Sequence, residues 1–181
     1  GNCAVLKPSE FAGATAAVMA KMIKQLFPEN YILYIEGDGA AVLPPLFENF
    51  RFDHIFYTGS TFVGKIIYKQ AAEKLVPVTL ELGGKSPAVV APDANVRVAA
   101  RRIANSKFSN CGQMCVAPDY VLVPTAFKQV LIDELIKAIE QFYGTDTASS
   151  DGYGKIINER QWHRLVGYFA DGKIVYGGKS D

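Results

Sequence analysis

Short apolar segments alternate along the chain with stretches in which apolar residues recur every three or four positions. The short segments have the length and composition of buried strands, and the longer stretches have the periodicity of amphipathic helices. Strands are expected at residues 4–6, 31–35, 53–57, 78–82, 86–90, 120–123 and 173–176, and helices at 12–27, 40–50, 62–75, 96–108, 127–142 and 159–170. Strand–helix–strand repetition with strands this apolar predicts an α/β fold with a doubly wound parallel sheet.

Composition places the chain among ordinary globular proteins and excludes some partners. Of its 181 residues, 49% are hydrophobic and 20% are charged, which is enough apolar material for a sizeable core. Nineteen basic and 18 acidic residues give a net charge of +1, so no global field favours nucleic acid or an anionic membrane surface. Every apolar run is broken well before the ~20 residues that a membrane-spanning helix needs.

The termini and the cysteines bear on cellular context. The first residues lack an initiator Met and the layout of a secretory signal, which suggests that the chain starts inside a longer one. Cys3, Cys111 and Cys115 do not resemble a disulfide framework and have no metal-ligand spacing with His54 or His163. No metal is therefore expected, and a reducing cytoplasm is the preferred compartment.

Cys115 and Glu81 are the candidate catalytic pair. Cys115 follows a Gly-Gln pair, interpreted as a flexible turn, in the run Asn-Cys-Gly-Gln-Met-Cys (residues 110–115), and Glu81 lies at the end of an apolar strand. A thiol so placed can act as a nucleophile, and a carboxylate can act as the base that activates thiol or water. Each alone has an ordinary explanation, since a single Cys is commonly a small buried hydrophobe and a single Glu commonly faces solvent. Together they suggest covalent thioester chemistry.

A phosphate-binding turn is predicted at the third strand–helix junction, in the run Thr-Gly-Ser-Thr-Phe-Val-Gly-Lys (residues 58–65). The N–H groups at a helix start attract phosphate. Gly59 lets the backbone bend, Ser60 can cap the helix or donate, and Gly64 permits close approach to a neighbour. The run departs from the G-x-G-x-x-G fingerprint by placing Ser60 and Thr61 where a second Gly would sit. A capped helix start without a ligand is the alternative.

Lys7 and Glu10 are a second candidate for cofactor contact. They follow the first strand, and ligands of open parallel sheets gather at the carboxyl ends of the strands. A Lys and a carboxylate there could hold ribose hydroxyls. The alternative is an ordinary strand exit with a solvated charge pair.

Taken in order, these segments resemble the aldehyde dehydrogenase superfamily, most closely its class 3 branch. The matching stretches are GNCAVLKPSE, FDHIFYTGSTFVGK, PVTLELGGKSP, RRIANSKFSNCGQMCVAPDY and YGKII, which run essentially from end to end. The resemblance implies oxidation of small-molecule aldehydes to carboxylic acids with NAD or NADP as cofactor. It matches Cys115 to the nucleophile and Glu81 to the general base, and the presence of Glu81 favours hydrolysis of the thioester over transfer to CoA.

The same resemblance implies the cofactor contacts. Lys7 and Glu10 match the residues that contact the adenosine ribose, and Leu82 lies where the nicotinamide end approaches. The pyrophosphate turn and its helix are matched by Gly59, Ser60, Thr61, Val63 and Gly64. Cys111 stands where class 3 relatives commonly carry a small hydroxyl residue and is expected to be non-catalytic.

The resemblance also implies a domain organisation. Residues 1–82 match the C-terminal part of the Rossmann-like dinucleotide-binding domain, and residues 83–181 match the N-terminal part of the catalytic domain. The family's oxyanion-hole Asn and its nicotinamide-ribose clamp lie outside these stretches, so the isolated piece is expected to be inactive. The full-length protein is expected to be a cytoplasmic homodimer. The alternatives are a catalytically silent relative that acts as a nucleotide-binding or interaction module, and a non-enzymatic structural domain. The choice of aldehyde and of NAD or NADP stays open.

Overall fold

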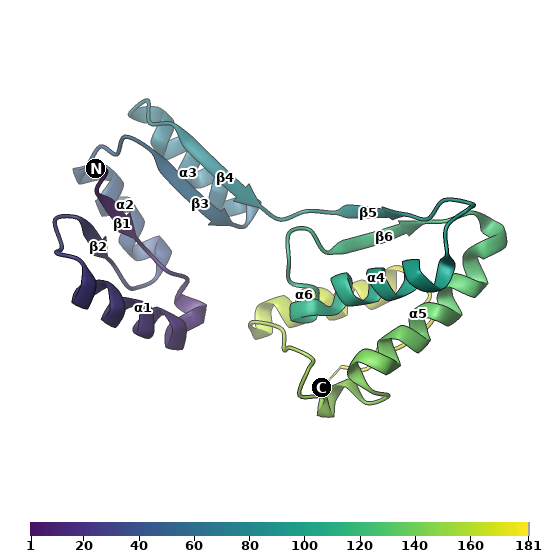
Figure 1. Ribbon diagram of the computed structural model, residues 1–181. Helices are drawn as coiled ribbons and strands as arrows, with labels where there is room; N and C mark the ends of the chain where they lie inside the picture. Colours follow the sequence, from purple (N-terminus) through teal and green to yellow (C-terminus); the bar gives the residue numbers. More distant parts are fainter. Residues whose placement is uncertain (181) are drawn as a thin grey trace. The chain divides into compact units, whose positions relative to one another are not determined.

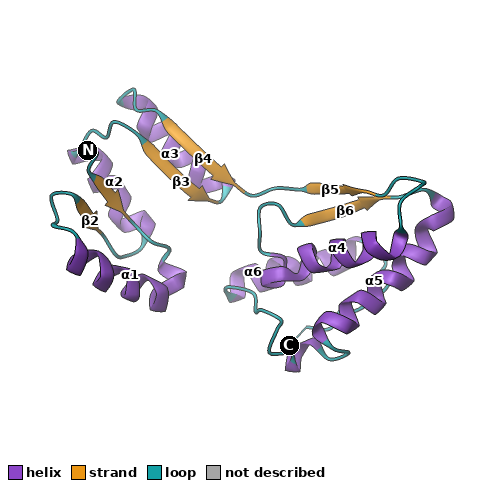
Figure 2. Ribbon diagram, viewed as in Figure 1, coloured by secondary structure: helices purple, strands orange, loops and turns teal. Residues whose placement is uncertain are grey.

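The computed structural model describes residues 1–180, shown in Figure 1 and, by secondary structure, in Figure 2. The packing of the chain divides it into two compact units. The first contains residues 1–58 and 62–81, and the second contains residues 59–61 and those from Leu82 onward. The predicted domains, 1–82 and 83–181, remain a prediction about cofactor-binding and catalytic roles.

The first strand–helix–strand repeat is built around a short parallel ladder. β1 (Ala4–Leu6) pairs with β2 (Ile32–Tyr34), with Val5 opposite Leu33, and α1 (Gly13–Leu26) connects them. The Tyr34 hydroxyl donates to the carbonyl of Ala16 at 3.0 Å and so ties β2 to the helix. Ala16 and Ala20 are the buried residues of α1, and these small side chains let the helix approach the strands closely.

The second repeat follows α2 (Gly39–Asn49). β3 (Ile55–Gly59) pairs with β4 (Val78–Leu82), α3 (Thr61–Glu73) connects them, and the two strand arrows run the same way in Figure 2. Lys74, just after α3, donates to the carbonyl of Glu48 at 2.8 Å. A cation at this place satisfies a free carbonyl and complements the negative end of α2.

In the second unit, the helices α4 (Val96–Phe108) and α5 (Lys128–Tyr143) pack against a parallel strand pair. β5 (Ser86–Val89) pairs with β6 (Pro118–Leu122), α4 connects them, and α5 and α6 (Glu159–Gly167) follow. The core is formed by Val90, Ala100 and Leu131, each less than 5% exposed. Ala100 and Ala104 have no exposed surface, so α5 can pack closely on α4.

Side-chain caps begin several helices where the sequence changes from loop to helical periodicity. The Asp38 carboxylate accepts from the Ala40 N–H at 2.6 Å, and the Asn95 side chain accepts from the Val98 N–H at 3.1 Å. Such caps satisfy N–H groups that have no partner within the helix. The start of α4, the helix that precedes the Cys115 loop, is therefore set by the local Asn95 cap.

The predicted elements are confirmed, with one exception. All six helices and the other six strands occur within three residues of their expected ends, and the strands pair two by two. The strand expected at 173–176 is wrong, because residues 172–180 form no ladder. Ile174 and Val175 are 47% and 60% exposed, and a short apolar segment becomes a strand only where a neighbouring strand pairs with its backbone N–H and C=O groups.

No helix within residues 1–180 combines the length and apolarity needed to cross a lipid bilayer.

The buried face of α5 generates a stability prediction. Leu131 is 3% exposed and packs against the α4 core, whereas its neighbour Val130 is 51% exposed. Leu131→Ala is expected to lower the free energy of unfolding by about 2–5 kcal/mol, since it removes buried methyl groups and leaves a cavity. Val130→Ala should change it by less than about 0.5 kcal/mol. Urea unfolding measures both, and equal losses would contradict this packing.

Candidate active site

Cys115 lies in a tightly turned loop between α4 and β6. Asn110, Cys111 and Gly112 have φ values of 50°, 56° and 75°, all in the left-handed region. Non-glycine residues occupy this region uncommonly, and each costs of order 1–3 kcal/mol that surrounding contacts must offset. The loop is therefore held in its conformation by its neighbours.

The nucleophile candidate occupies an exposed turn. The Ala117 N–H donates to the Met114 carbonyl at 3.2 Å, so residues 114–117 form a turn with Cys115 at its second position. Cys115 is exposed, while Ala117 is only 6% exposed and anchors the turn at the start of β6. The thiol is thus presented to solvent from a turn with a buried end.

The chain leaving β4 touches the backbone of this turn. A Cβ added at Gly84 would lie 2.3 Å from the carbonyl oxygen of Cys115, far inside van der Waals contact. Only glycine fits there, because any side chain would displace either the turn or the strand exit. The adjacent Lys85 ammonium lies 3.2 Å from the Asp119 carboxylate in β6, which adds a weak, exposed ion pair between the same two segments.

Glu81 is an exposed residue of β4 and belongs to the first unit, whereas Cys115 belongs to the second. In the same strand, Thr79 forms a 3.0 Å hydrogen bond with His54, which gives that histidine a partner that the sequence does not reveal. The role of Glu81 as a base stays a prediction.

Lys7 and Glu10 form a partly buried pair beside a helix start. The Lys7 ammonium donates to Glu10 Oε2 at 3.1 Å and to the Pro8 carbonyl at 2.7 Å, and its side chain is only 15% exposed. A Cβ added at Gly39, the first residue of α2, would lie 3.7 Å from Lys7 Cε. A hydrogen bond from its own backbone N–H, and then the bond from Lys7, lower the pKa of Glu10. The Glu10 carboxyl is therefore ionised at neutral pH.

The candidate phosphate turn contains a single residue between the strand and the helix. β3 ends at Gly59 and α3 begins at Thr61, so Ser60 alone joins them. The exposed first turn of α3 carries N–H groups that point away from the helix body. Further along α3, Gly64 is buried and Val63 is partly buried. Leu82, the last residue of β4, is partly buried as well.

The cofactor contacts at these two groups stay predictions. In general, N–H groups at a helix start can bind a phosphate, and an ammonium–carboxylate pair can hydrogen-bond ribose hydroxyls. Within residues 1–180, no three His, Cys, Asp or Glu side chains lie together in an arrangement that could hold a metal ion.

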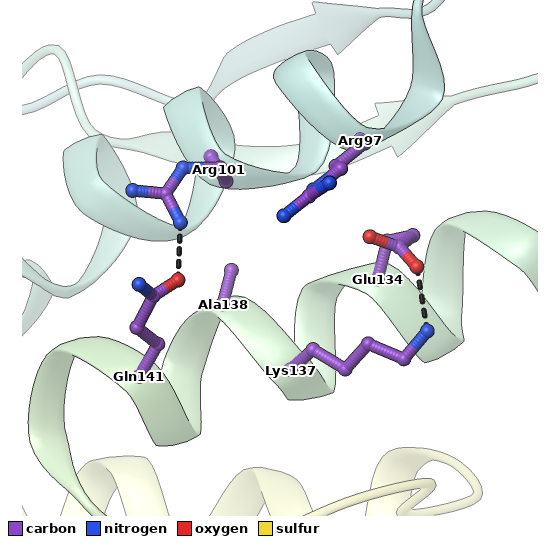
Figure 3. A pocket seen from close by; sticks show the side chains of 6 residues that line it. All are labelled: Arg97, Arg101, Glu134, Lys137, Ala138 and Gln141. Carbon is purple, nitrogen blue, oxygen red and sulfur yellow. Dashed lines mark hydrogen bonds and ion pairs between the residues drawn. The ribbon is translucent and has the colours of Figure 1, made fainter.

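The hollows of the second unit lie away from the predicted residues. A polar cleft of about 240 Å³ lies between α4 and α5, and Figure 3 shows its lining side chains: Arg97, Arg101, Glu134, Lys137, Ala138 and Gln141. In it, Arg101 donates to Gln141 and Lys137 pairs with Glu134. A more apolar hollow of about 530 Å³ lies at the ends of β5 and β6, lined by residues 89, 90, 121–124 and 128. Neither includes Cys115 or a predicted cofactor contact.

Gln113 is the residue whose contribution the sequence does not predict. Its amide nitrogen donates to the carbonyls of Asn110 and Lys155, both at 3.0 Å, and its amide oxygen accepts from the Ile157 N–H at 2.9 Å. The glutamine of the Gly-Gln pair is therefore hydrogen-bonded to the loop and to a second segment, which the interpretation as a flexible turn does not predict. Two of the partners, Lys155 and Ile157, lie more than 40 residues further along the chain, where no local pattern indicates them.

Parallel strand pairs joined by helices are the repeating units of Rossmann-like α/β folds. The aldehyde dehydrogenase family model matches residues 1–180, and the chain is a member of that family. The predicted resemblance is thereby confirmed.

Two characterised relatives are similar along the whole chain. It is 48% identical over 183 residues to 4,4'-diaponeurosporen-aldehyde dehydrogenase of Staphylococcus aureus, and 46% identical over 181 residues to the dimeric NADP-preferring aldehyde dehydrogenase of Rattus norvegicus. Both alignments cover 100% of this chain but only 39% and 40% of the relatives. The chain therefore spans about two-fifths of their length.

Solved structures agree on the fold. Staphylococcus aureus AldH in a substrate-bound state superposes with a TM-score of 0.93 at 47% identity, covering 100% of this chain and 40% of that one. An NADP-dependent glyceraldehyde-3-phosphate dehydrogenase of Bacillus halodurans, complexed with NADP, gives 0.89 at 29% identity, covering 100% and 39%. The predicted α/β, Rossmann-like class is confirmed.

The contact between Gly84 and Cys115 generates a prediction with a control in the neighbouring residue. Gly84→Ala is expected to lower the free energy of unfolding by about 1–3 kcal/mol, because the added methyl group overlaps the Cys115 carbonyl oxygen. A Cβ at Gly83 meets no atom within 4 Å, so Gly83→Ala should be neutral or stabilise by up to about 1 kcal/mol. Chemical denaturation compares the two, and a neutral Gly84→Ala would disprove the close approach.

Proposed function

We propose that the protein containing this chain is an NAD(P)-dependent aldehyde dehydrogenase that oxidises aldehydes to carboxylic acids, with Cys115 as nucleophile and Glu81 as general base. The observation that carries the proposal is the exposed Cys115 turn packed against Gly84, at the exit of the strand that contains Glu81. Membership of the aldehyde dehydrogenase family supports this chemistry.

The first chemical step is performed by Cys115. Its thiolate forms a carbon–sulfur bond to the aldehyde carbon and produces a tetrahedral thiohemiacetal with a negatively charged oxygen. The backbone N–H of Cys115 is a donor for that oxyanion, and the hydrogen bonds around its turn hold the donor in place before the reaction. When bound, the nicotinamide accepts the hydride from this carbon, which leaves a thioester on Cys115.

Glu81 acts in the second step. Its carboxylate takes a proton from water as the water oxygen attacks the thioester carbon. The carbon–sulfur bond then breaks, the carboxylic acid leaves, and Cys115 returns as thiolate. Lys7 and Glu10 would hold the adenosine ribose of the cofactor, the Ser60 junction and the start of α3 would hold its pyrophosphate, and Leu82 would lie near its nicotinamide.

A silent nucleotide-binding relative is the competing function. The presence of both Cys115 and Glu81 argues against it, because neither side chain is needed to bind a nucleotide. We further propose that the full-length protein is a homodimer, by analogy with the relative named dimeric. A cytoplasmic location stays a prediction.

Replacement of the nucleophile tests the assignment directly. Cys115→Ala in the full-length enzyme is expected to lower aldehyde-dependent NAD(P)H formation by about 10⁴-fold or more, because no thioester can form. Cys3→Ala is the matched control, since Cys3 is an exposed cysteine in the first unit, and it should keep the wild-type rate. Absorbance at the nicotinamide band measures both, and unimpaired turnover by Cys115→Ala would exclude this nucleophile.

Replacement of the base should separate the two steps. Glu81→Gln is expected to retain a burst of one NAD(P)H per site, followed by steady turnover slowed by about 10²–10⁴-fold, because the thioester still forms but water is not activated. Mass spectrometry should find the acyl group on Cys115. Glu73→Gln, at an exposed carboxylate in α3, should turn over normally. A Glu81→Gln enzyme with wild-type steady turnover would rule out Glu81 as the base.

A further inference from the structure

The Gln113 side chain makes three hydrogen bonds, and all three go to backbone groups. Both amide hydrogens are donated, one to Asn110 and one to Lys155, and the amide oxygen accepts from Ile157. An asparagine would be one methylene too short to reach the second segment, and a methionine of similar size would leave the Ile157 N–H and two carbonyls without these partners. This pattern requires a glutamine.

The segment that Gln113 reaches is packed closely against the strained part of the loop. A Cβ added at Gly154 would lie 3.6 Å from the Cys111 amide nitrogen, so residues 153–157 run directly alongside the backbone of the loop. Tyr153 stacks edge-on with Tyr143 of α5 at 5.2 Å between ring centroids and also contacts Phe108 at the end of α4. The 153–157 segment is therefore packed against the helices, and the hydrogen bonds of Gln113 connect the Cys115 loop to this segment.

The hydrogen bonds from Gln113 to residues 155 and 157 form a tether, and this tether lies next to the left-handed residues of the loop. Two further hydrogen bonds join the backbone of Gln113 to Asn110, across the residues with left-handed backbone conformation. The Gln113 N–H donates to the Asn110 carbonyl at 3.1 Å, and the Asn110 side chain donates to the Gln113 carbonyl at 3.3 Å. Met114 alone separates this anchor from Cys115, and buried Ala117 anchors the other side. Cys115 thus lies between two fixed points.

We propose that Gln113 is a positioning residue for Cys115, which holds the thiol and the neighbouring backbone N–H in their reactive placement by tying the loop to residues 155–157. This proposal rests on the proposed function. Misplacement of a reacting group by about 1 Å can cost roughly 100-fold in rate, so loss of the tether should appear in the chemical step more than in cofactor binding.

Truncation of the side chain in the full-length enzyme is the first test. Gln113→Ala is expected to lower kcat by about 10–100-fold while the KM for NAD(P) changes by less than about threefold. The Ile157 amide should exchange its hydrogen about tenfold faster, as expected for loss of one hydrogen bond. Gln129→Ala is the matched control, because the Gln129 amide donates to Asp133 within α5, at 2.9 Å, away from the Cys115 loop. This variant should alter neither the kcat nor the exchange rate.

An isosteric variant supplies a readout that a purely structural role would not move. Gln113→Glu keeps the acceptor for the Ile157 N–H, but its ionised carboxylate faces the carbonyls of Asn110 and Lys155, which raises the pKa of the new carboxyl. Protonation restores one donor. The activity of Gln113→Glu relative to wild type is therefore expected to rise several-fold between pH 8 and pH 6, at a temperature where circular dichroism finds all variants folded.

The outcomes separate the two proposals. A full-length wild-type enzyme without aldehyde-dependent NAD(P)H formation overturns the proposed function, while exchange at Ile157 still tests the tether. An active wild type with unchanged kcat in Gln113→Ala, or with a pH-independent Gln113→Glu ratio, overturns the positioning role alone. An equal fall in Gln129→Ala also overturns it, since the effect would then not belong to this loop.

Discussion

The close approach of Gly84 to the carbonyl oxygen of Cys115 is the constraint on which the candidate site depends. It needs a residue without a side chain where the chain leaves β4, and it needs the cysteine turn to keep its backbone facing that exit. Because main chain meets main chain there, neither segment can shift without losing the contact. The turn is exposed at its thiol yet closely packed behind it, which is what a nucleophile on a loop requires.

The layer beneath the loop explains how it stays in place. α4 begins at the Asn95 cap and presents Ala100 and Ala104 to α5, so the two helices pack closely and the end of α4 is well defined. Aromatic rings close that end: Phe108, Tyr143 and Tyr153 pack together. Burial raises the pKa of Tyr153, with a hydrogen bond to Cys111 as the next contribution, so the phenol stays neutral at physiological pH. Helix packing thus supports the strained loop from behind.

The candidate cofactor contacts combine opposite charges at short range. An ammonium near the start of α2 is disfavoured by the positive end of the helix dipole, and the Glu10 carboxylate and Pro8 carbonyl offset that cost. A nucleotide with a 2′-phosphate would be repelled by Glu10 and attracted by Lys7, whereas ribose hydroxyls can hydrogen-bond both. On charge alone, the pair therefore does not select between NAD and NADP.

Local pattern predicted most of the elements and marked the candidate reactive groups. α4 occurs at Val96–Phe108 as expected, since the apolar period and the Asn95 cap are both local signals, and Cys115 and Glu81 are recognisable by their neighbours in the chain. Only the tertiary structure decided that residues 173–176 form no strand, that Gly84 meets Cys115, and that Gln113 holds residues 155 and 157. The physical reason is that these outcomes depend on hydrogen-bond partners and packing surfaces supplied by distant segments, and local periodicity carries no record of them.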